Sequence, residues 1–391
     1  MGKKNRVDML NVLRVLAFLT IFLLHAKSFI PVNWNENFGG AWLLYTPAWG
    51  GTWIFFLLSG YGVGSGFYGG KYEISKEGIL YYYWKRIRAI LPLYYFWLFL
   101  IAVFIKPEIM VPSGENIGYW LKLLLLDYRA EFYPTEFGLG WYLGTLMRLY
   151  LAAPLGYYLL RKTVKSEKQV YAALAFLTGM GLLARCLAGY RIASTGSGNW
   201  SLDVYTPFYF NLDLFFSGML LNHLKEYRGK LSGGGLKRFR DAVPVAALLA
   251  FILLNSRLYY EASYFGGDYL DMYMYVFPSV YLLLAGFYVY CFAVRRDFVQ
   301  TDLDRGQVRK NPMRIFDYFP KIQFPVYLFH NTVLLCLSRG YDEVFYQNLC
   351  SALGVTEYRL HAVMGCLFTV KALLVSVVLA AVIHKMTEGK K

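Results

Sequence analysis

The sequence predicts an all-α polytopic membrane protein, built as a single transmembrane domain over residues 1–391. Hydrophobic residues make up 57% of the chain, a larger share than the core of a soluble protein of this length would hold. Several apolar stretches also run for roughly 20 residues without interruption, which is the length that a helix needs to cross a bilayer. Both observations favour a bundle of transmembrane helices over a soluble fold.

Apolar runs bounded by charged residues or by Gly and Pro predict about ten transmembrane helices. The predicted helices cover residues 9–29, 47–69, 89–106, 138–160, 170–189, 205–222, 241–256, 270–294, 322–338 and 362–384. The segments that connect them are alternately rich and poor in Lys and Arg, and the basic ones belong on the cytoplasmic side. We therefore expect both the N-terminus and the C-terminus to be cytoplasmic, in the inner (plasma) membrane of the cell.

The formal net charge of +15 comes from these short basic clusters between apolar runs. Because the clusters do not line one amphipathic face, the charge indicates membrane topology and not nucleic-acid binding. The longest predicted outer loop, residues 106–137, holds an apolar patch at 119–126 that is too short to span the membrane. We expect this patch to dip into the membrane interface.

The first predicted helix carries polar residues where lipid contact would be expected. Asn11, Arg14, Phe18 and His25 follow the spacing i, i+3, i+7 and i+14, which places them on one helix face. Polar groups at this depth are costly unless they face protein or a water-filled cavity, so they indicate a functional site. The usual pKa of histidine, near 6.5, suits proton transfer from a hydroxyl. A hydrogen-bonded packing histidine is the alternative.

The second predicted helix combines aromatic and small residues. Ser59 and Tyr61 flank Gly60, and further glycines follow at positions 62, 64 and 66. Small residues allow two helices to approach closely, or they leave an opening in the bundle. The pattern is compatible with either arrangement.

A basic cluster stands where the third predicted helix begins. Lys85, Arg86 and Arg88 precede Pro92, and guanidinium groups bind phosphate through paired hydrogen bonds. An anionic cytoplasmic donor would therefore bind here, although the preference of basic residues for the cytoplasmic side explains the cluster equally well.

Ionisable residues also lie within three later helices. Arg148 and Asp213 fall near the centres of the fourth and sixth, where a pair of opposite charges is tolerated and a single charge is costly. We predict that these two lie near one another as a structural pair. His330, near the middle of the ninth helix, is expected to face the same cavity as His25.

Taken in order, these motifs resemble the acyltransferase-3 family of integral membrane O-acyltransferases. The family motifs D-x-x-R…H, F-F-x-x-S-G-[FY], K-R-x-x-R-I-x-P-x-Y, W-[FY]-L…Y…P, F-F-x-G and I-Y-L-x-H resemble, in turn, Asn11 to His25, Phe55 to Tyr61, Lys85 to Tyr94, Trp141 to Pro154, Phe215 to Gly218 and Val326 to His330. Three positions depart from the family pattern. Asn11 replaces the commoner Asp, Ala89 stands at the second arginine position, and Leu146 stands where one branch has Glu.

The resemblance implies transfer of an acyl group, expected to be acetyl, from cytoplasmic acyl-CoA to a hydroxyl of a cell-surface or secreted carbohydrate or glycolipid. Acyl-CoA is then a co-substrate, and neither a bound cofactor nor a metal is expected. His25 is the expected general base or transient acyl carrier. The residues implied in the site are His25, Arg14 and Asn11 for catalysis, Arg86, Arg88 and Lys85 for donor binding, and Ser59, Tyr61, Trp141, Tyr150 and His330 for the cavity.

Two other functions remain compatible with the pattern. A transporter or flippase of lipid-linked saccharides would have similar helices and intramembrane charges. Inverted repeats would favour it, and the sequence has none that we recognise. A polymerase or ligase of surface polysaccharide is the third possibility, and it predicts a larger outer domain than the 106–137 loop supplies.

Overall fold

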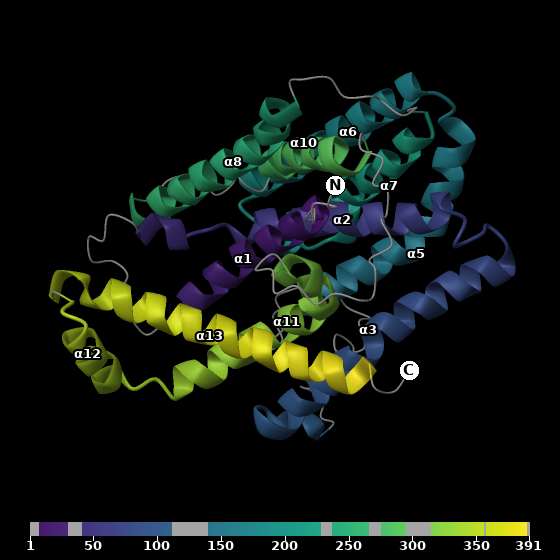
Figure 1. Ribbon diagram of the computed structural model, residues 1–391. Helices are drawn as coiled ribbons and strands as arrows, with labels where there is room; N and C mark the ends of the chain where they lie inside the picture. The colour runs from purple at the N-terminus through teal and green to yellow at the C-terminus, as the bar shows by residue number, and fades with distance from the viewer. Residues whose placement is uncertain are drawn as a thin grey trace, which may run out of the picture.

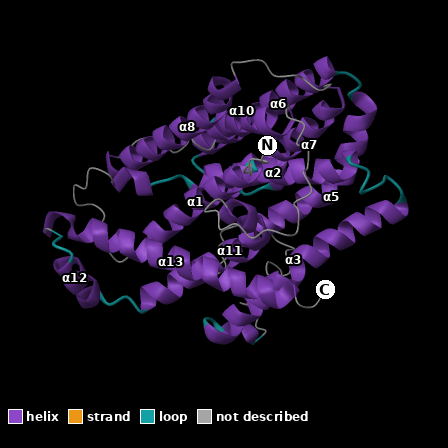
Figure 2. Cartoon of the chain, in the orientation of Figure 1, coloured by secondary structure: helices purple, strands orange, loops and turns teal. Residues whose placement is uncertain are grey.

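The computed structural model describes residues 8–29, 41–111, 140–227, 237–265, 275–294, 314–355 and 357–388. Figure 1 and Figure 2 show that every regular element in these ranges is a helix, which confirms the predicted all-α fold. The α-helices are α1 (Met9–Phe29), α2 (Ala48–Tyr68), α3 (Lys76–Phe104), α5 (Gly140–Thr163), α6 (Glu167–Thr195), α7 (Leu212–Tyr227), α8 (Lys237–Phe265), α10 (Phe277–Val289), α11 (Arg314–Arg339), α12 (Glu343–Ala352) and α13 (Glu357–Glu388). Short helical turns are η1 (Ala41–Leu44), η2 (Pro107–Met110), η5 (Ser201–Tyr205), η6 (Phe208–Asn211) and η7 (Tyr290–Val294).

Six helices in the described ranges are long and apolar enough to cross a membrane. They are α1, α3, α6, α8, α13 and the continuous segment formed by α10 and η7. The chain is thus a multi-pass membrane protein, while the count of about ten spans and the cytoplasmic placement of the termini stay predictions. Helix α2 is 21 residues long but is not among the six; other helices bury most of its residues, so lipid contact does not dictate them.

Several helices differ from the predicted boundaries by more than a turn: α8 runs to Phe265 against a predicted end at 256, and α11 begins at Arg314 against a predicted start at 322. Helix α3 begins at Lys76, well before the predicted start at 89, because the Ser75 hydroxyl accepts a hydrogen bond from the Gly78 amide at 3.0 Å and caps the helix. Lys85, Arg86 and Arg88 therefore lie inside α3 and not ahead of it. Helix α12 was not predicted, because its 10 residues are too few for a membrane span. The predicted interfacial patch at 119–126 lies outside the described residues.

Helix α2 lies at the centre of the bundle and contacts α1, α5, α7 and α10. In the orientation of Figure 1, α6, α8 and α10 lie above it, while α11, α12 and α13 lie below. Helix α11 packs on α1, α3 and α13. Helix α3 also contacts α5, so α1, α2, α3, α5 and α11 are neighbours within the bundle.

The glycines of α2 serve both purposes that the sequence left open. A Cβ atom on Gly60 would collide with the Phe215 carbonyl oxygen of α7, and one on Gly218 of α7 would collide with the Leu57 carbonyl oxygen of α2. Two helices approach this closely only where small residues face each other. Gly62, by contrast, has no neighbouring atom within 4 Å of its Cβ position, and it lines a cavity described below.

We expect Gly60→Ala to destabilise the protein by about 1–3 kcal/mol, because the new methyl group meets rigid helix backbone and the two helices must separate. The matched control is Gly62→Ala, whose methyl group enters open space and should leave stability unchanged or slightly higher. Thermal unfolding in detergent, followed by size-exclusion chromatography, measures the difference. Equal midpoints for the two variants would contradict the close packing of α2 on α7.

A buried ion pair joins α6 to α7. Arg185 donates from Nη2 to Oδ2 of Asp213 at 2.7 Å and from Nη1 to Oδ1 at 3.1 Å, and the two residues are only 1% and 4% exposed. The same guanidinium also donates to the Phe210 carbonyl at 2.7 Å and to the Ser279 hydroxyl of α10 at 2.9 Å. The hydrogen bonds of Arg185 therefore connect α6 to α7 and α10.

The predicted partner of Asp213 was wrong. Asp213 pairs with Arg185, while Arg148 donates from Nη1 to the Gly144 carbonyl of its own helix at 2.9 Å. Helix α6 comes close enough for this because Gly181 faces the Asp213 carboxylate without a side chain in between. Spacing along single helices does not reveal which helices are neighbours.

Candidate functional site

A cavity of about 310 Å³ opens between α1, α2, α3, α5 and α11, and we call it the central cavity. Aromatic and aliphatic side chains form most of its wall. Its polar side chains are Arg14, Ser59, Arg86, Tyr142, Tyr150, Gln323 and Tyr327. The structure thus brings together four of the residues implied by the sequence, namely Arg14, Ser59, Arg86 and Tyr150.

Two guanidinium groups make the central cavity electropositive. Arg14 comes from α1 and Arg86 from α3, and none of the described residues that line the cavity is Asp or Glu. The guanidinium of Arg86 lies over the rings of Tyr150 and Tyr82, at 4.9 and 5.4 Å from their centroids. Its Nε atom is buried and has no hydrogen-bond partner among the described residues. Such a cavity suits an anionic or carbonyl-bearing ligand.

Asn11 orients Arg14 although it lacks the carboxylate of the family motif. Nη1 of Arg14 donates to Oδ1 of Asn11 at 2.7 Å, across one turn of α1. The amide oxygen accepts this hydrogen bond as a carboxylate would, but it does not neutralise the guanidinium. The substitution therefore leaves more net positive charge beside the cavity.

The two histidines implied by the sequence meet each other across α1 and α11. Nδ1 of His25 lies 2.9 Å from Nε2 of His330, and the two rings are nearly parallel, with centroids 5.1 Å apart. His330 is fully buried, whereas His25 is partly exposed. The edge of the Phe18 ring also contacts His330, at 5.8 Å between centroids. The stripe on α1 thus faces α11.

A backbone carbonyl fixes where the ring hydrogens of this pair lie. Nδ1 of His330 is 2.6 Å from the carbonyl oxygen of Tyr327, which only accepts, so Nδ1 carries the hydrogen. In a neutral ring Nε2 of His330 is then an acceptor, and Nδ1 of His25 donates to it. This assignment follows from the hydrogen-bond network. It leaves the lone pair of His25 on Nε2.

The histidine pair lies beside the central cavity and not in its wall. Tyr327 connects the two, because its side chain lines the cavity and its ring contacts His330 at 5.8 Å between centroids. Tyr142, another wall residue, packs on Tyr327 at 5.1 Å. The sequence spacing did not indicate Gln323 as a cavity residue. Tyr142 and Tyr327 lie within the motifs quoted above, but the sequence analysis did not name them as site residues.

The other implied residues lie outside the wall of the central cavity. Lys85 and Arg88 are exposed on α3, so their predicted role in donor binding stays a prediction. Tyr61 is buried, and Nζ of Lys225 lies 4.8 Å from its ring centroid. Trp141 packs on Tyr205 at 4.7 Å between ring centroids.

A family model described as an acyltransferase domain matches residues 7–385 of the chain. The match begins just before α1 and ends within α13, so the central cavity and the histidine pair both lie inside it. Comparison with curated proteins and with solved structures gives no match.

Proposed function

The chain belongs to the acyltransferase-3 family and is a membrane-embedded acyltransferase, and we propose that it moves an acyl group, expected to be acetyl, from cytoplasmic acyl-CoA to a carbohydrate hydroxyl. The observation that carries this proposal is the histidine pair, which leaves a lone pair on Nε2 of His25 and is connected to the electropositive cavity through Tyr327. The acceptor is a cell-surface or secreted glycan or glycolipid. The inner membrane is the proposed location.

In the proposed reaction, the acceptor hydroxyl gives its proton to Nε2 of His25 while its oxygen attacks the carbonyl carbon of the thioester. The carbon–sulfur bond breaks, the acyl group stays on the acceptor oxygen, and CoA leaves as a thiolate. The proton then passes from His25 to this thiolate. If His25 instead carries the acyl group transiently, the same Nε2 lone pair is the nucleophile.

His330 supports this chemistry without touching the substrate. Its Nε2 accepts the Nδ1 hydrogen of His25 in the neutral state, and it continues to accept it when His25 becomes positively charged. This is the part that a carboxylate plays in serine hydrolases, where it holds the imidazole in one tautomer. Here a second imidazole, anchored to a backbone carbonyl, replaces the carboxylate.

The central cavity supports an anionic donor. Its wall holds two guanidinium groups and no described Asp or Glu, and guanidinium groups bind anionic groups through paired hydrogen bonds. Arg86 in the cavity wall belongs to the cluster on α3 that the sequence places at the cytoplasmic side. Donor and acceptor would therefore reach His25 from opposite sides of the membrane.

The direct test uses inside-out membrane vesicles that contain the protein and receive labelled acetyl-CoA on the cytoplasmic face. We expect release of free CoA and transfer of label to the lipid or glycan fraction, above the level of vesicles without the protein. Unchanged acetyl-CoA combined with movement of a lipid-linked saccharide across the membrane would contradict the proposal. That result would favour the transporter alternative, which needs no general base.

We expect His330→Ala to lower kcat for acyl transfer by about 100-fold, because His25 loses the acceptor that holds its ring. The KM for the donor should not change, since His330 does not line the central cavity. His330→Gln presents an amide oxygen to the same hydrogen and should recover part of kcat. Steady-state rates on purified protein decide this point, and equal kcat values for the two variants would rule out the positioning role.

A further inference from the structure

A second, larger pocket of about 650 Å³ opens where α2, α5 and α7 end. Tyr68 is the last residue of α2, and Gly70 follows in the turn after it. Arg161 and Lys162 lie in the last turn of α5, and Glu226 lies at the end of α7. This is the side of the bundle that the sequence predicts to be cytoplasmic. We call it the outer-ring pocket, after the aromatic rings that form its wall.

The outer-ring pocket has an aromatic wall, and its rim carries charges of both signs. Tyr157 stacks on Phe67 at 4.8 Å and 21°, and Tyr68 meets the Tyr157 ring edge-on at 4.8 Å. Arg161, Lys162 and Lys165 supply positive charge at the rim, and Glu73 and Glu226 supply negative charge. Flat rings stack on planar bases, and guanidinium groups bind phosphate through paired hydrogen bonds. Together these groups have the chemistry to recognise a phosphorylated nucleotide.

The Tyr68 hydroxyl indicates that the pocket receives a polar ligand. Tyr68 lines the pocket, and its hydroxyl is buried with no hydrogen-bond partner among the described residues. A buried hydroxyl without a partner is unfavourable, because it has lost its hydrogen bonds to water. A ligand with a polar edge removes this cost when it binds.

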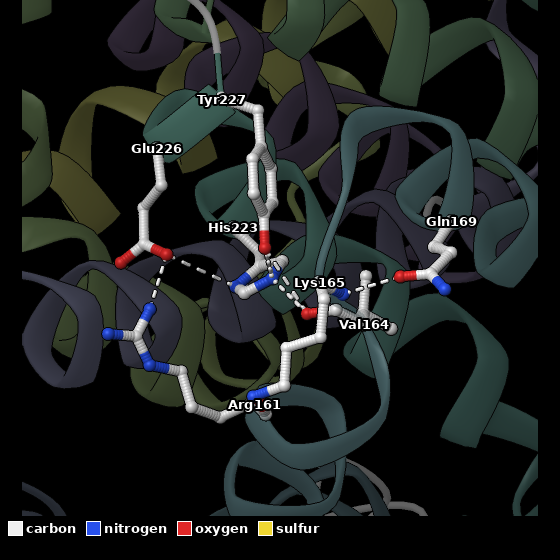
Figure 3. Close-up of polar contacts among 7 residues, drawn as sticks. All are labelled: Arg161, Val164, Lys165, Gln169, His223, Glu226 and Tyr227. Atoms are coloured by element: carbon white, nitrogen blue, oxygen red, sulfur yellow. Dashed lines mark hydrogen bonds and ion pairs between the residues drawn. The ribbon is translucent and has the colours of Figure 1, made fainter.

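Arg161, the main candidate for binding a phosphate, is paired with the carboxylate of Glu226 in the structure. Figure 3 shows Glu226 paired with Arg161, and its Oε2 also faces Nδ1 of His223 at 3.6 Å. The His223 ring is buried and is held from its other nitrogen by the Val164 carbonyl at 2.9 Å and the Tyr227 hydroxyl at 3.0 Å. When a phosphate displaces Glu226 from Arg161, the carboxylate therefore still has a polar neighbour in His223.

A single aromatic ring separates the outer-ring pocket from the central cavity. Tyr82 is fully buried and contacts Phe67 and Tyr72 of the outer-ring pocket, each at 5.1 Å between ring centroids. It also lies under the Arg86 guanidinium and donates from its hydroxyl to the Tyr150 carbonyl at 3.2 Å. Arg86 and Tyr150 line the central cavity. The two pockets are thus immediate neighbours.

We propose that the outer-ring pocket binds the phosphorylated adenosine end of the acyl-CoA donor, with the base on the Tyr157 and Tyr158 side and a phosphate on Arg161. The proposal rests on acyl-CoA being the donor, as argued above. Acyl-CoA carries its thioester and its nucleotide at opposite ends of a flexible arm, so it requires two neighbouring sites. The central cavity takes the thioester end, and the outer-ring pocket takes the nucleotide end.

The test begins with binding, which requires no turnover. The probe is adenosine 3′,5′-bisphosphate, titrated into the purified full chain in lipid nanodiscs, with acetyl-CoA as the competitor. Arg161→Gln should weaken binding of the probe about tenfold. Glu226→Gln should strengthen it, because Arg161 is then released from its carboxylate. Lys168→Gln is the matched control, since Lys168 is exposed on the neighbouring α6 and does not line the pocket.

The kinetic arm compares acetyl-CoA with acetyl-pantetheine, a donor that lacks the nucleotide. Arg161→Gln should raise the KM for acetyl-CoA about tenfold, with kcat unchanged, and leave the kinetics with acetyl-pantetheine unaffected. Opposite effects of Arg161→Gln and Glu226→Gln exclude a general loss of folding as the cause.

Three results would overturn the assignment. The first is equal affinity of wild type and Arg161→Gln for the bisphosphate. The second is probe binding that depends on Arg161 but is not displaced by acetyl-CoA, which means that the pocket holds a free nucleotide. The third is an equal loss of activity with both donors. If wild type consumes neither donor, the proposed function fails, whereas displacement of the probe by acetyl-CoA still decides what the outer-ring pocket binds.

Discussion

His25→Ala will lower kcat for acyl transfer by about 10²- to 10⁴-fold, the range expected when a general base is lost. The reason is local, because Nε2 of His25 is the nitrogen that the hydrogen bonds of the pair leave with a lone pair. Loss of the imidazole leaves the acceptor hydroxyl with no proton acceptor from this pair. The measurement is release of CoA from acetyl-CoA by purified protein, at saturating donor.

The control for this experiment is a second membrane histidine outside the site. His384 lies in α13, near the Tyr318 ring, and it lines neither of the two pockets. His384→Ala should retain the wild-type rate. Both variants should elute from size-exclusion chromatography as the wild type does. A His25→Ala protein that matches His384→Ala in rate would refute the assignment of the base.

Arg185→Met will destabilise the protein by about 3–5 kcal/mol, because it leaves the Asp213 carboxylate buried without a counter-charge. Asp213 is only 4% exposed, so water cannot replace the guanidinium. The Phe210 carbonyl and the Ser279 hydroxyl also lose their donor. The thermal unfolding midpoint in detergent should fall well below that of wild type, and the yield of folded protein should fall with it.

The double variant Arg185→Met/Asp213→Leu separates the cost of an unpaired charge from the cost of lost packing. Replacement of both partners by apolar residues is often neutral, so most of the lost stability should return. Arg191→Met, on an exposed position of the same helix, is the matched control and should leave the midpoint unchanged. A double variant as unstable as Arg185→Met would show that the ion pair is not the source of the effect.

The sequence predicts the helical fold and the polar stripe of α1 because both depend on local spacing. The stripe from Asn11 to His25 has one face whatever its surroundings are, and the structure places that face toward α11 and the central cavity. The order of the six motifs likewise identifies the family. These features need no knowledge of which helices touch.

Pairings between distant helices could not be predicted in the same way. His25 and His330 are 305 positions apart, and spacing within one helix carries no information on its neighbours. Asp213 shows the consequence, because Arg148 was predicted as its partner from depth alone, whereas Gly181 lets α6 and its Arg185 approach the carboxylate. The start of α3 was missed because charged residues were taken to end a span, although a capped helix continues beyond the membrane.

The hydrogen bond that holds His330 is accepted by a main-chain carbonyl, and this affects which substitutions the protein tolerates. The carbonyl of Tyr327 holds Nδ1 of His330, and every amino acid at position 327 would supply the same carbonyl. Drift at that position can reshape the cavity wall, and so alter which acyl chains fit, while the tautomer of the pair stays the same. In the proposed reaction, selectivity and proton transfer are therefore separable in evolution, because the first depends on a side chain and the second depends on a backbone atom that no point mutation deletes.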